Sequence, residues 1–157
     1  MTLAVLEGPL QPLLEQALDE SWALWHDGLT RPAYGAYNAA QLKTQWGAAH
    51  LARVGLVEGG RLLASAKRYA LTVWLDGRRI PALGIGAVFT PPALRGRGHA
   101  PVLVERLCDE ARAQGRGVAL LFSEIGARYY ERLGFRVVPH STSEVVVQSG
   151  TGAPAVL

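Results

Sequence analysis

The chain has 157 residues, of which 49% are hydrophobic and 18% are charged, with a formal net charge of +3 and a pI near 9.4. This length and composition predict one globular domain and exclude an intrinsically disordered chain. With a single cysteine, Cys108, the chain forms no internal disulfide, and a cysteine-based zinc site is excluded.

Targeting signals and charge runs are both absent from the sequence. No apolar run is long enough to cross a membrane, and the first residues lack the basic leader of a signal peptide. We therefore expect a cytoplasmic protein with no membrane partner. The small excess of positive charge suits an anionic ligand. Without a long Lys/Arg run, a nucleic-acid partner is an alternative that the pattern does not favour.

The N-terminal part predicts a short edge strand followed by two helices. The strand is an apolar run over residues 3–6. Residues 12–25 repeat apolar side chains at spacings of three and four, which is typical of a helix. Residues 29–36 resemble a loop, and residues 38–49 predict a second helix with Asn38 as its cap.

The pattern then changes to three consecutive strands. Residues 52–58, 61–75 and 79–89 are rich in β-forming side chains. Gly59-Gly60 and Asp76-Gly77 lie between them and are typical of hairpin turns. Together these segments predict an antiparallel meander.

A helix and a further strand follow the meander. Residues 98–114 predict an amphipathic helix, and residues 118–122 predict a short strand with both faces covered. Because a crossover through a helix joins parallel strands, this strand should lie parallel to the one over residues 79–89.

The chain is expected to close with a short helix, two strands and a flexible tail, at residues 126–133, 135–138, 144–147 and 149–157. The expected fold class is α+β in a single domain over residues 1–157. Its sheet is mixed and mostly antiparallel, contains one parallel strand pair, and is flanked by helices.

The most specific motif is a glycine-rich turn between the strand over residues 79–89 and the next helix. It reads Arg95-Gly96-Arg97-Gly98-His99-Ala100. Glycines let backbone N–H groups approach a ligand closely. The N-terminal end of a helix favours negative charge, and arginines bind phosphate. The turn therefore predicts a site for a phosphate-bearing ligand, although it lacks both the Walker A ending and the third glycine of a Rossmann fingerprint.

Two motifs resemble one known family. Arg95-x-x-Gly98-x-Ala100 is similar to the Arg/Gln-x-x-Gly-x-Gly/Ala signature of the GCN5-related N-acetyltransferases (GNAT). The spacing back to Val88 and Pro92 fits that family, as does the later element that starts at Tyr130 and reads YERLGF. The resemblance covers about residues 83–138. The segment FSEIGARYYERLGF also resembles, more weakly, the fungal lysine N-acetyltransferase-type branch.

The resemblance implies a GNAT-like sheet whose central parallel pair is splayed around coenzyme A. Acetyl-CoA would be the co-substrate, a primary amine the acceptor, and no metal is expected. The pantetheine arm would contact backbone around Val88, Phe89 and Thr90. The pyrophosphate would bind the turn, for which the cofactor-binding residues are Arg95, Gly96, Arg97, Gly98, His99 and Ala100.

Acetyl transfer to an amine needs an oxyanion donor, a proton acceptor and a proton donor. A bulge near Val88 would free a backbone N–H for the oxyanion. Tyr130, on the position that faces the coenzyme's sulfur in the family, can protonate the departing thiolate, since a thiol has a pKa of about 8.5 and a tyrosine about 10. Glu124 is the first candidate for the base or for binding the amine, and Glu58 is the second. Ser123 replaces the Asn that many family members carry.

Two functions stay open on the sequence. The first is an N-acetyltransferase that transfers the acetyl group directly in a ternary complex. Its acceptor would be a small molecule, such as an amino acid or amine, rather than a peptide. The alternative is a catalytically weak acyl-CoA-binding sensor or regulatory module. A homodimer is also left open.

Overall fold

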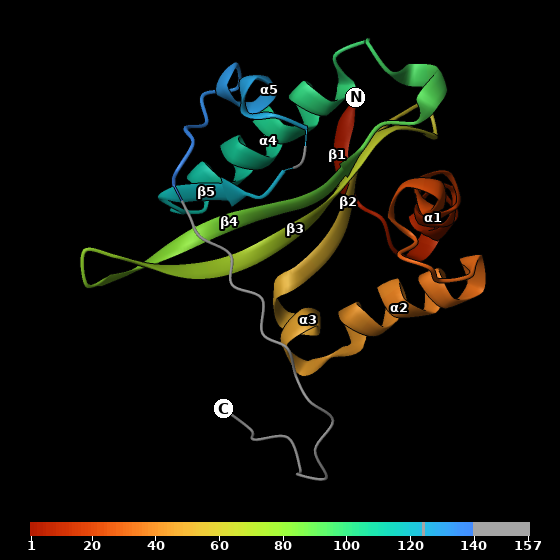
Figure 1. Cartoon of the computed structure of the whole chain (residues 1–157), viewed down its shortest axis with the longest axis horizontal. Coiled ribbons are helices and arrows are strands. Elements are labelled where there is room, and N and C mark those ends of the chain that lie inside the picture. Colours follow the sequence, from red (N-terminus) through yellow and green to blue (C-terminus); the bar gives the residue numbers. More distant parts are fainter. Residues whose placement is uncertain (124, 140–157) are drawn as a thin grey trace, which may run out of the picture.

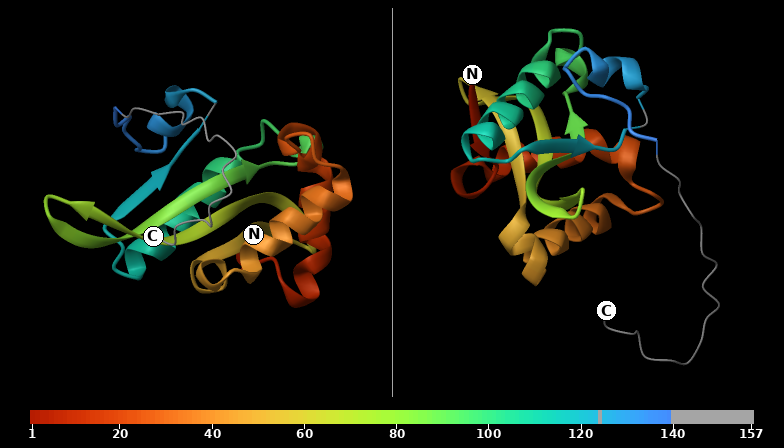
Figure 2. Two further views of the ribbon diagram at one scale, coloured as in Figure 1. Left: turned by 60° about the horizontal axis from the view of Figure 1, so that its bottom comes forward. Right: turned by 90° about the vertical axis from the view of Figure 1, so that its left-hand side faces the viewer.

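The computed structural model describes residues 1–123 and 125–139. Within them, five strands form one sheet in the order β1-β2-β3-β4-β5, with helices on both faces (Figures 1 and 2). The strands are β1 (Thr2–Val5), β2 (Leu51–Glu58), β3 (Arg61–Leu75), β4 (Arg78–Phe89) and β5 (Val118–Leu121). The helices are α1 (Gln11–Trp25), α2 (Arg31–Lys43), α3 (Gln45–His50), α4 (His99–Ala113) and α5 (Ala127–Glu131), with 3₁₀ turns η1 (Gly8–Leu10) and η2 (Pro92–Leu94).

The meander and the parallel pair are both confirmed. β1, β2 and β3 each pair with the next strand in antiparallel fashion. β5 pairs with β4 in parallel, with Ala82 opposite Val118 and Ile85 opposite Leu121. This is the α+β fold expected from the sequence. Within the described residues β5 is the outermost strand of the sheet, so the parallel pair lies at that edge.

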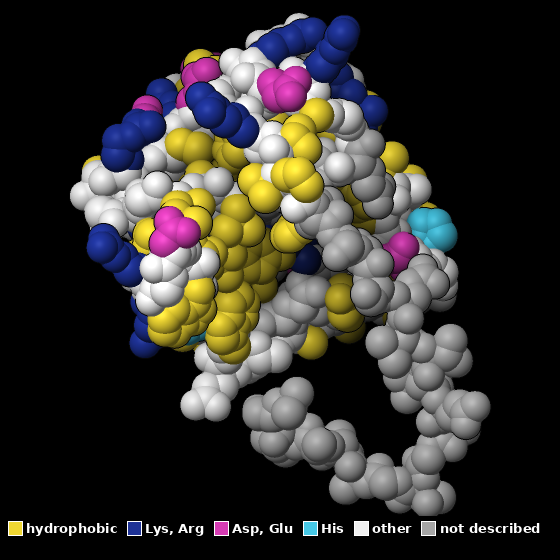
Figure 3. All heavy atoms as spheres, turned by 60° about the vertical axis from the view of Figure 1, so that its left-hand side comes forward, with side chains coloured by type: hydrophobic (Ala, Val, Ile, Leu, Met, Phe, Trp, Pro, Cys, Tyr) yellow, Lys and Arg dark blue, Asp and Glu magenta, His cyan; other side chains and the backbone are white. Residues whose placement is uncertain are grey.

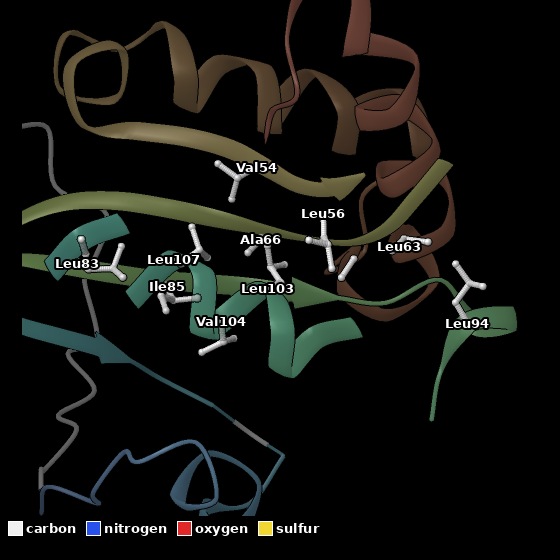
Figure 4. Packing of buried hydrophobic residues seen from close by; sticks show 12 residues of the cluster. Val54, Leu56, Leu63, Ala66, Leu83, Ile85, Leu94, Leu103, Val104 and Leu107 are labelled. Atoms are coloured by element: carbon white, nitrogen blue, oxygen red, sulfur yellow. The ribbon is translucent and has the colours of Figure 1, made fainter. Parts of the chain in front are cut away.

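Two hydrophobic clusters hold the helices to the two faces of the sheet. On one face, Leu103 and Leu107 of α4 pack on side chains of β2, β3 and β4, among them Val54 and Ile85 (Figure 4). On the opposite face, α1 and α2 cover a second cluster around Leu62. Burying both faces is the main stabilising contribution of such a sheet, because apolar area leaves water on each side.

The expected loop over residues 29–36 is wrong, because α2 already begins at Arg31. The Thr30 hydroxyl accepts the Ala33 N–H at 3.4 Å, and Pro32 fits the first turn, where a helix needs no N–H. Asn38 is therefore no cap but a buried residue inside α2. Thr44 separates α2 from α3 and caps α3 through the Gly47 N–H at 2.8 Å.

The C-terminal expectations divide into three outcomes. The short helix is confirmed as α5. The strand over residues 135–138 is wrong: no strand forms there, and the Val138 side chain is 74% exposed. Phe135 instead packs against the cluster under α4. The expected strand 144–147, the tail 149–157 and Glu124 lie outside the described residues.

Leu103→Ala tests the packing of α4 on the sheet. Leu103 has 0% exposure, so the truncation should lower the free energy of unfolding by about 3 kcal/mol through lost burial and the remaining cavity. Urea denaturation measures this change. Leu24→Ala is the matched control, since Leu24 is 56% exposed and should cost little. Equal losses in the two variants would contradict the described core.

Candidate functional site

A bulge interrupts β4 close to its end. The pairing with β3 steps from Ser65–Phe89 to Lys67–Gly86, so β4 spans this step with one residue more than β3. Ala87 lies in the bulge with φ of 46°, a left-handed conformation that non-glycine residues rarely adopt. The bulge that the sequence predicted near Val88 is therefore present. It takes backbone groups of β4 out of the regular ladder.

The pairing between β4 and β5 also ends early. The last pair is Ile85–Leu121, whereas β4 continues to Phe89. Within the described residues, the edge of β4 beyond Ile85 thus has no β5 partner. Phe89 is buried at 3% exposure, with its ring edge-on to Trp25 at 6.1 Å, and Val88 packs toward the α4 core. Both residues would therefore meet a ligand through their backbone.

The glycine-rich turn leads from β4 into α4. Gly96 and Gly98 have φ of 75° and 79°, and a Cβ at either would meet nothing within 4 Å. The backbone conformation, rather than crowding, therefore requires glycine. Gly98 is the N-cap of α4 and no side chain caps that end. The N–H groups of the first helical turn, including those of His99 and Ala100, have no partner within the helix and suit an anion.

The turn's arginines differ in their contacts. The Arg95 Nε donates to the Thr90 carbonyl at 3.3 Å, and its guanidinium lies 6.0 Å from the Phe89 ring centroid. This holds Arg95 across the turn that starts after β4. Arg97 is exposed. Its cation is available to a phosphate outside the turn, because an exposed guanidinium offers a planar set of N–H donors.

Tyr130 lies on α5 and is anchored to the end of β5. Its side chain is 7% exposed and packs edge-on against the Phe135 ring at 6.0 Å. Burial raises the pKa of Tyr130, and a hydrogen bond with Ser123 lowers it in part. Ser123 follows β5 by two residues, so Tyr130 is tied to the carboxyl end of that strand. A buried phenol kept protonated at neutral pH is able to donate a proton.

The structure describes one of the two candidate carboxylates, Glu58. Glu124 lies outside the described residues, and its role stays a prediction. Glu58 is exposed at the end of β2 and accepts a bond from the Met1 amino group at 3.2 Å. Because β3 separates β2 from β4, Glu58 is not brought to the bulge. We therefore retain Glu124 as the first candidate for the base.

A polar cluster on the α2 face of the sheet was missed by the sequence analysis. We call it the basic cluster; it consists of Tyr34, Asn38 and Gln41 from α2, Arg53 from β2, and Lys67 and Tyr69 from β3. The Arg53 Nη2 donates to Asn38 Oδ1, and the Lys67 Nζ donates to Gln41 Oε1, both at 2.6 Å. The sequence did carry a signal for this cluster. Arg53 and Lys67 are charged residues on the inward-facing sides of two adjacent strands.

The basic cluster reaches β4 next to the bulge. Lys67 pairs with Gly86, the residue before Ala87. The Tyr69 ring lies so close to Gly86 that a Cβ there would be 3.1 Å from its Cε2 atom. Figure 3 shows this end of the molecule, where hydrophobic side chains gather near the β3–β4 hairpin and a Lys or Arg side chain is recessed among them. The cluster therefore lies beside the bulge in β4.

Other site types find little support in the part of the chain that the structure describes. No group of three or more His, Cys, Asp or Glu side chains is placed to hold a metal ion there. In the same residues, no helix combines the length and apolarity needed to span a bilayer. Two surface depressions, one along α1 and one between Gly60–Leu62 and Pro91–Leu94, do not include the bulge, Tyr130 or the basic cluster.

Lys67 makes folding stability depend on pH. Burial, with the nearby Arg53 charge, lowers the pKa of Lys67 from 10.5 to about 8. Between these values the unfolded chain binds more protons, so stability should rise with pH. The free energy of unfolding of the wild type, relative to Lys67→Met, should rise between about pH 7 and about pH 9 by less than about 1 kcal/mol after solvent screening.

Urea denaturation at the two pH values measures this difference. Burial raises the pKa of Tyr69, which works in the opposite direction only as the pH approaches the ordinary value of 10.0. Lys43→Met is the control, since Lys43 is exposed at the end of α2. A wild-type advantage over Lys67→Met that falls or stays constant with rising pH would contradict the burial of Lys67.

Comparisons with known proteins agree with this geometry. A family model described as an acetyltransferase (GNAT) domain matches residues 10–138. An uncharacterized N-acetyltransferase of Streptomyces avermitilis is 27% identical over 124 residues, which cover 77% of this chain and 30% of that protein. The chain thus spans about a third of the length of this relative.

Solved structures share the fold. A transcriptional regulator from Bacillus halodurans C-125 is 17% identical with a TM-score of 0.69. An acetyltransferase from Trypanosoma brucei is 23% identical with a TM-score of 0.65. Each alignment covers 92% of this chain and 99% of the other.

At such identities these structures show the fold alone. None of the matches supports the weaker resemblance to the fungal lysine branch. The family model, however, spans most of the chain and includes the bulge, the glycine-rich turn and Tyr130. The chain therefore belongs to the GNAT acetyltransferase family.

Proposed function

We propose that the chain transfers an acetyl group from acetyl-CoA to a primary amine by direct attack in a ternary complex. One observation carries the proposal: within the described residues the edge of β4 beyond Ile85 has no β5 partner, and β4 is followed, through η2, by the glycine-rich turn. An extended ligand lying along that edge would have its anionic end at the N-terminus of α4. Acetyl-CoA has this form, with a pantetheine arm that ends in a pyrophosphate.

Acetyl-CoA would bind through the protein backbone more than through side chains. The amide-containing pantetheine arm would add sheet-like hydrogen bonds to β4 around Val88 and Thr90, since β5 leaves that edge unpaired. The pyrophosphate would accept bonds from N–H groups of the turn between Arg97 and Ala100. Arg95 and Arg97 would add charge-assisted bonds to phosphate oxygens.

The reaction forms a C–N bond and breaks the thioester C–S bond. The amine must first lose a proton, for which Glu124 is the proposed acceptor. Its attack produces an oxyanion, which a backbone N–H of the bulge near Val88 would stabilise. The intermediate then expels the thiolate of coenzyme A. Tyr130 would give this thiolate its proton, because a phenol, whose ordinary pKa of 10.0 is raised further here by burial, is protonated at neutral pH.

A weak acyl-CoA-binding sensor is the second candidate function. A sensor needs the turn and the open edge of β4, but it does not need a proton donor beside the thioester. The placement of a protonated, buried Tyr130 at the end of β5 favours the enzyme. A sensor would bind acetyl-CoA tightly and release no thiol with any amine.

Tyr130→Phe tests the acid role. The variant should keep its affinity for coenzyme A, while kcat for thiol release with a small-amine panel falls by about 100-fold or more, because the leaving thiolate loses its proton donor. Tyr129→Phe is the matched control, since Tyr129 is the neighbouring tyrosine on α5 and is less buried. Unchanged turnover in Tyr130→Phe would remove Tyr130 from the mechanism. Tight binding of coenzyme A by a wild type that never turns over would support the sensor.

A further inference from the structure

In the basic cluster Arg53 is buried and Lys67 is half-buried, and both cations lie beside neutral groups. Arg53 is 8% exposed and donates to Asn38, and its side chain also hydrogen-bonds Tyr34. Lys67 donates to Gln41. Across residues 1–123 and 125–139, no salt bridge joins either cation to a carboxylate. The contrast with Arg68 on β3 is direct, because it faces α4 and pairs with Glu110 at 3.0 Å.

Placing these two cations beside neutral groups and away from water lowers the stability of the folded protein. A buried cation loses its hydration, and hydrogen bonds to amides and phenols restore only part of it. The two cations also repel each other: burial is the main cause of the lowered pKa of Lys67, and the Arg53 charge lowers it further. An anion placed between them would relieve both costs. Its charge-assisted bonds would be strong, because the surroundings exclude most of the water.

The position of the cluster relates it to the reaction. Lys67 and Tyr69 lie on β3 opposite β4, and Lys67 pairs with Gly86 immediately before the bulge. Glycine at position 86 lets the Tyr69 ring rest against the β4 backbone, so the cluster and the bulge share one face of the ladder. Lys67 and Tyr69 are both half-buried, which leaves part of each side chain accessible. A small molecule bound there would lie beside the bulge in β4.

We propose that the acceptor is a small amine that carries an anionic group, a carboxylate or a phosphate, which binds between Arg53 and Lys67. This inference rests on the proposed function for the position of the amine. The anion fixes the acceptor on the α2 face of the sheet and directs its amine toward the bulge in β4. The Gln41 side-chain NH₂ and the Tyr69 hydroxyl would donate further hydrogen bonds to the anion.

The test compares amines that differ only in the anion. L-Alanine is paired with L-alaninamide, and phosphoethanolamine with ethanolamine, with rates corrected for the free-base fraction of each amine. The wild type should prefer the anionic member of at least one pair by about tenfold or more in kcat/KM, as expected for a charge-assisted bond. The pair that shows the preference identifies carboxylate or phosphate. A preference for the neutral member of both pairs would overturn the inference.

Lys67→Met keeps the apolar stem and removes the charge. The preference ratio should fall by about tenfold, and Lys67→Arg should restore most of it. Lys43→Met changes the net charge equally at an exposed site and should leave the ratio unchanged. A thermal unfolding curve of each variant shows that it is folded. A ratio that stays the same in folded Lys67→Met would overturn the inference.

A binding measurement separates this inference from the proposed function. Calorimetric titration of each amine pair into the wild type with coenzyme A present needs no turnover. Anion-dependent binding that is lost in Lys67→Met supports the inference even if no amine ever releases thiol, in which case the proposed function fails alone. If all four amines are acetylated without any anion-dependent binding or preference, the inference is contradicted and the proposed function is supported.

Discussion

The whole site depends on β4 leaving its ladders before it ends. A regular strand satisfies its backbone groups on both sides, and those groups are then unavailable to a ligand. In β4 two features leave backbone groups outside the regular pairing. Pairing with β5 ends at Ile85, and the bulge at Ala87 shifts the register against β3. The helices bury the two faces of the sheet, and the glycine-rich turn joins the end of this strand, through η2, to the start of α4.

Much of this arrangement could be predicted because it is local in sequence. Alternating side chains and paired turn residues specify β2, β3 and β4, and the turn beginning at Arg95 signals the start of α4. The first half of α2 was missed because Pro32 and Gly35 resemble a loop, although proline is tolerated in a first turn. The apolar run at residues 135–138 has strand propensity but no ladder partner among the described residues, and propensity alone does not make a strand.

The basic cluster could not be located in this way because its members come from three elements. Arg53 and Lys67 stand out only once β2 and β3 are paired with a known register and the face under α2 is known to be buried. The neutral partners Tyr34, Asn38 and Gln41 recur along one stripe of α2, a helix whose first half resembled a loop. Tertiary contacts, and not periodicity, bring these charges together.

The buried Arg53 and the half-buried Lys67 place stability and specificity in opposition. Replacing either by an apolar residue would remove a desolvation cost, so a search for more thermostable versions of this domain should favour such replacements. The same replacements would erase the feature that distinguishes one acceptor from another. Some close relatives will have been selected for heat resistance and others for substrate specificity. These two groups should therefore differ at Arg53 and Lys67 sooner than in the glycine-rich turn.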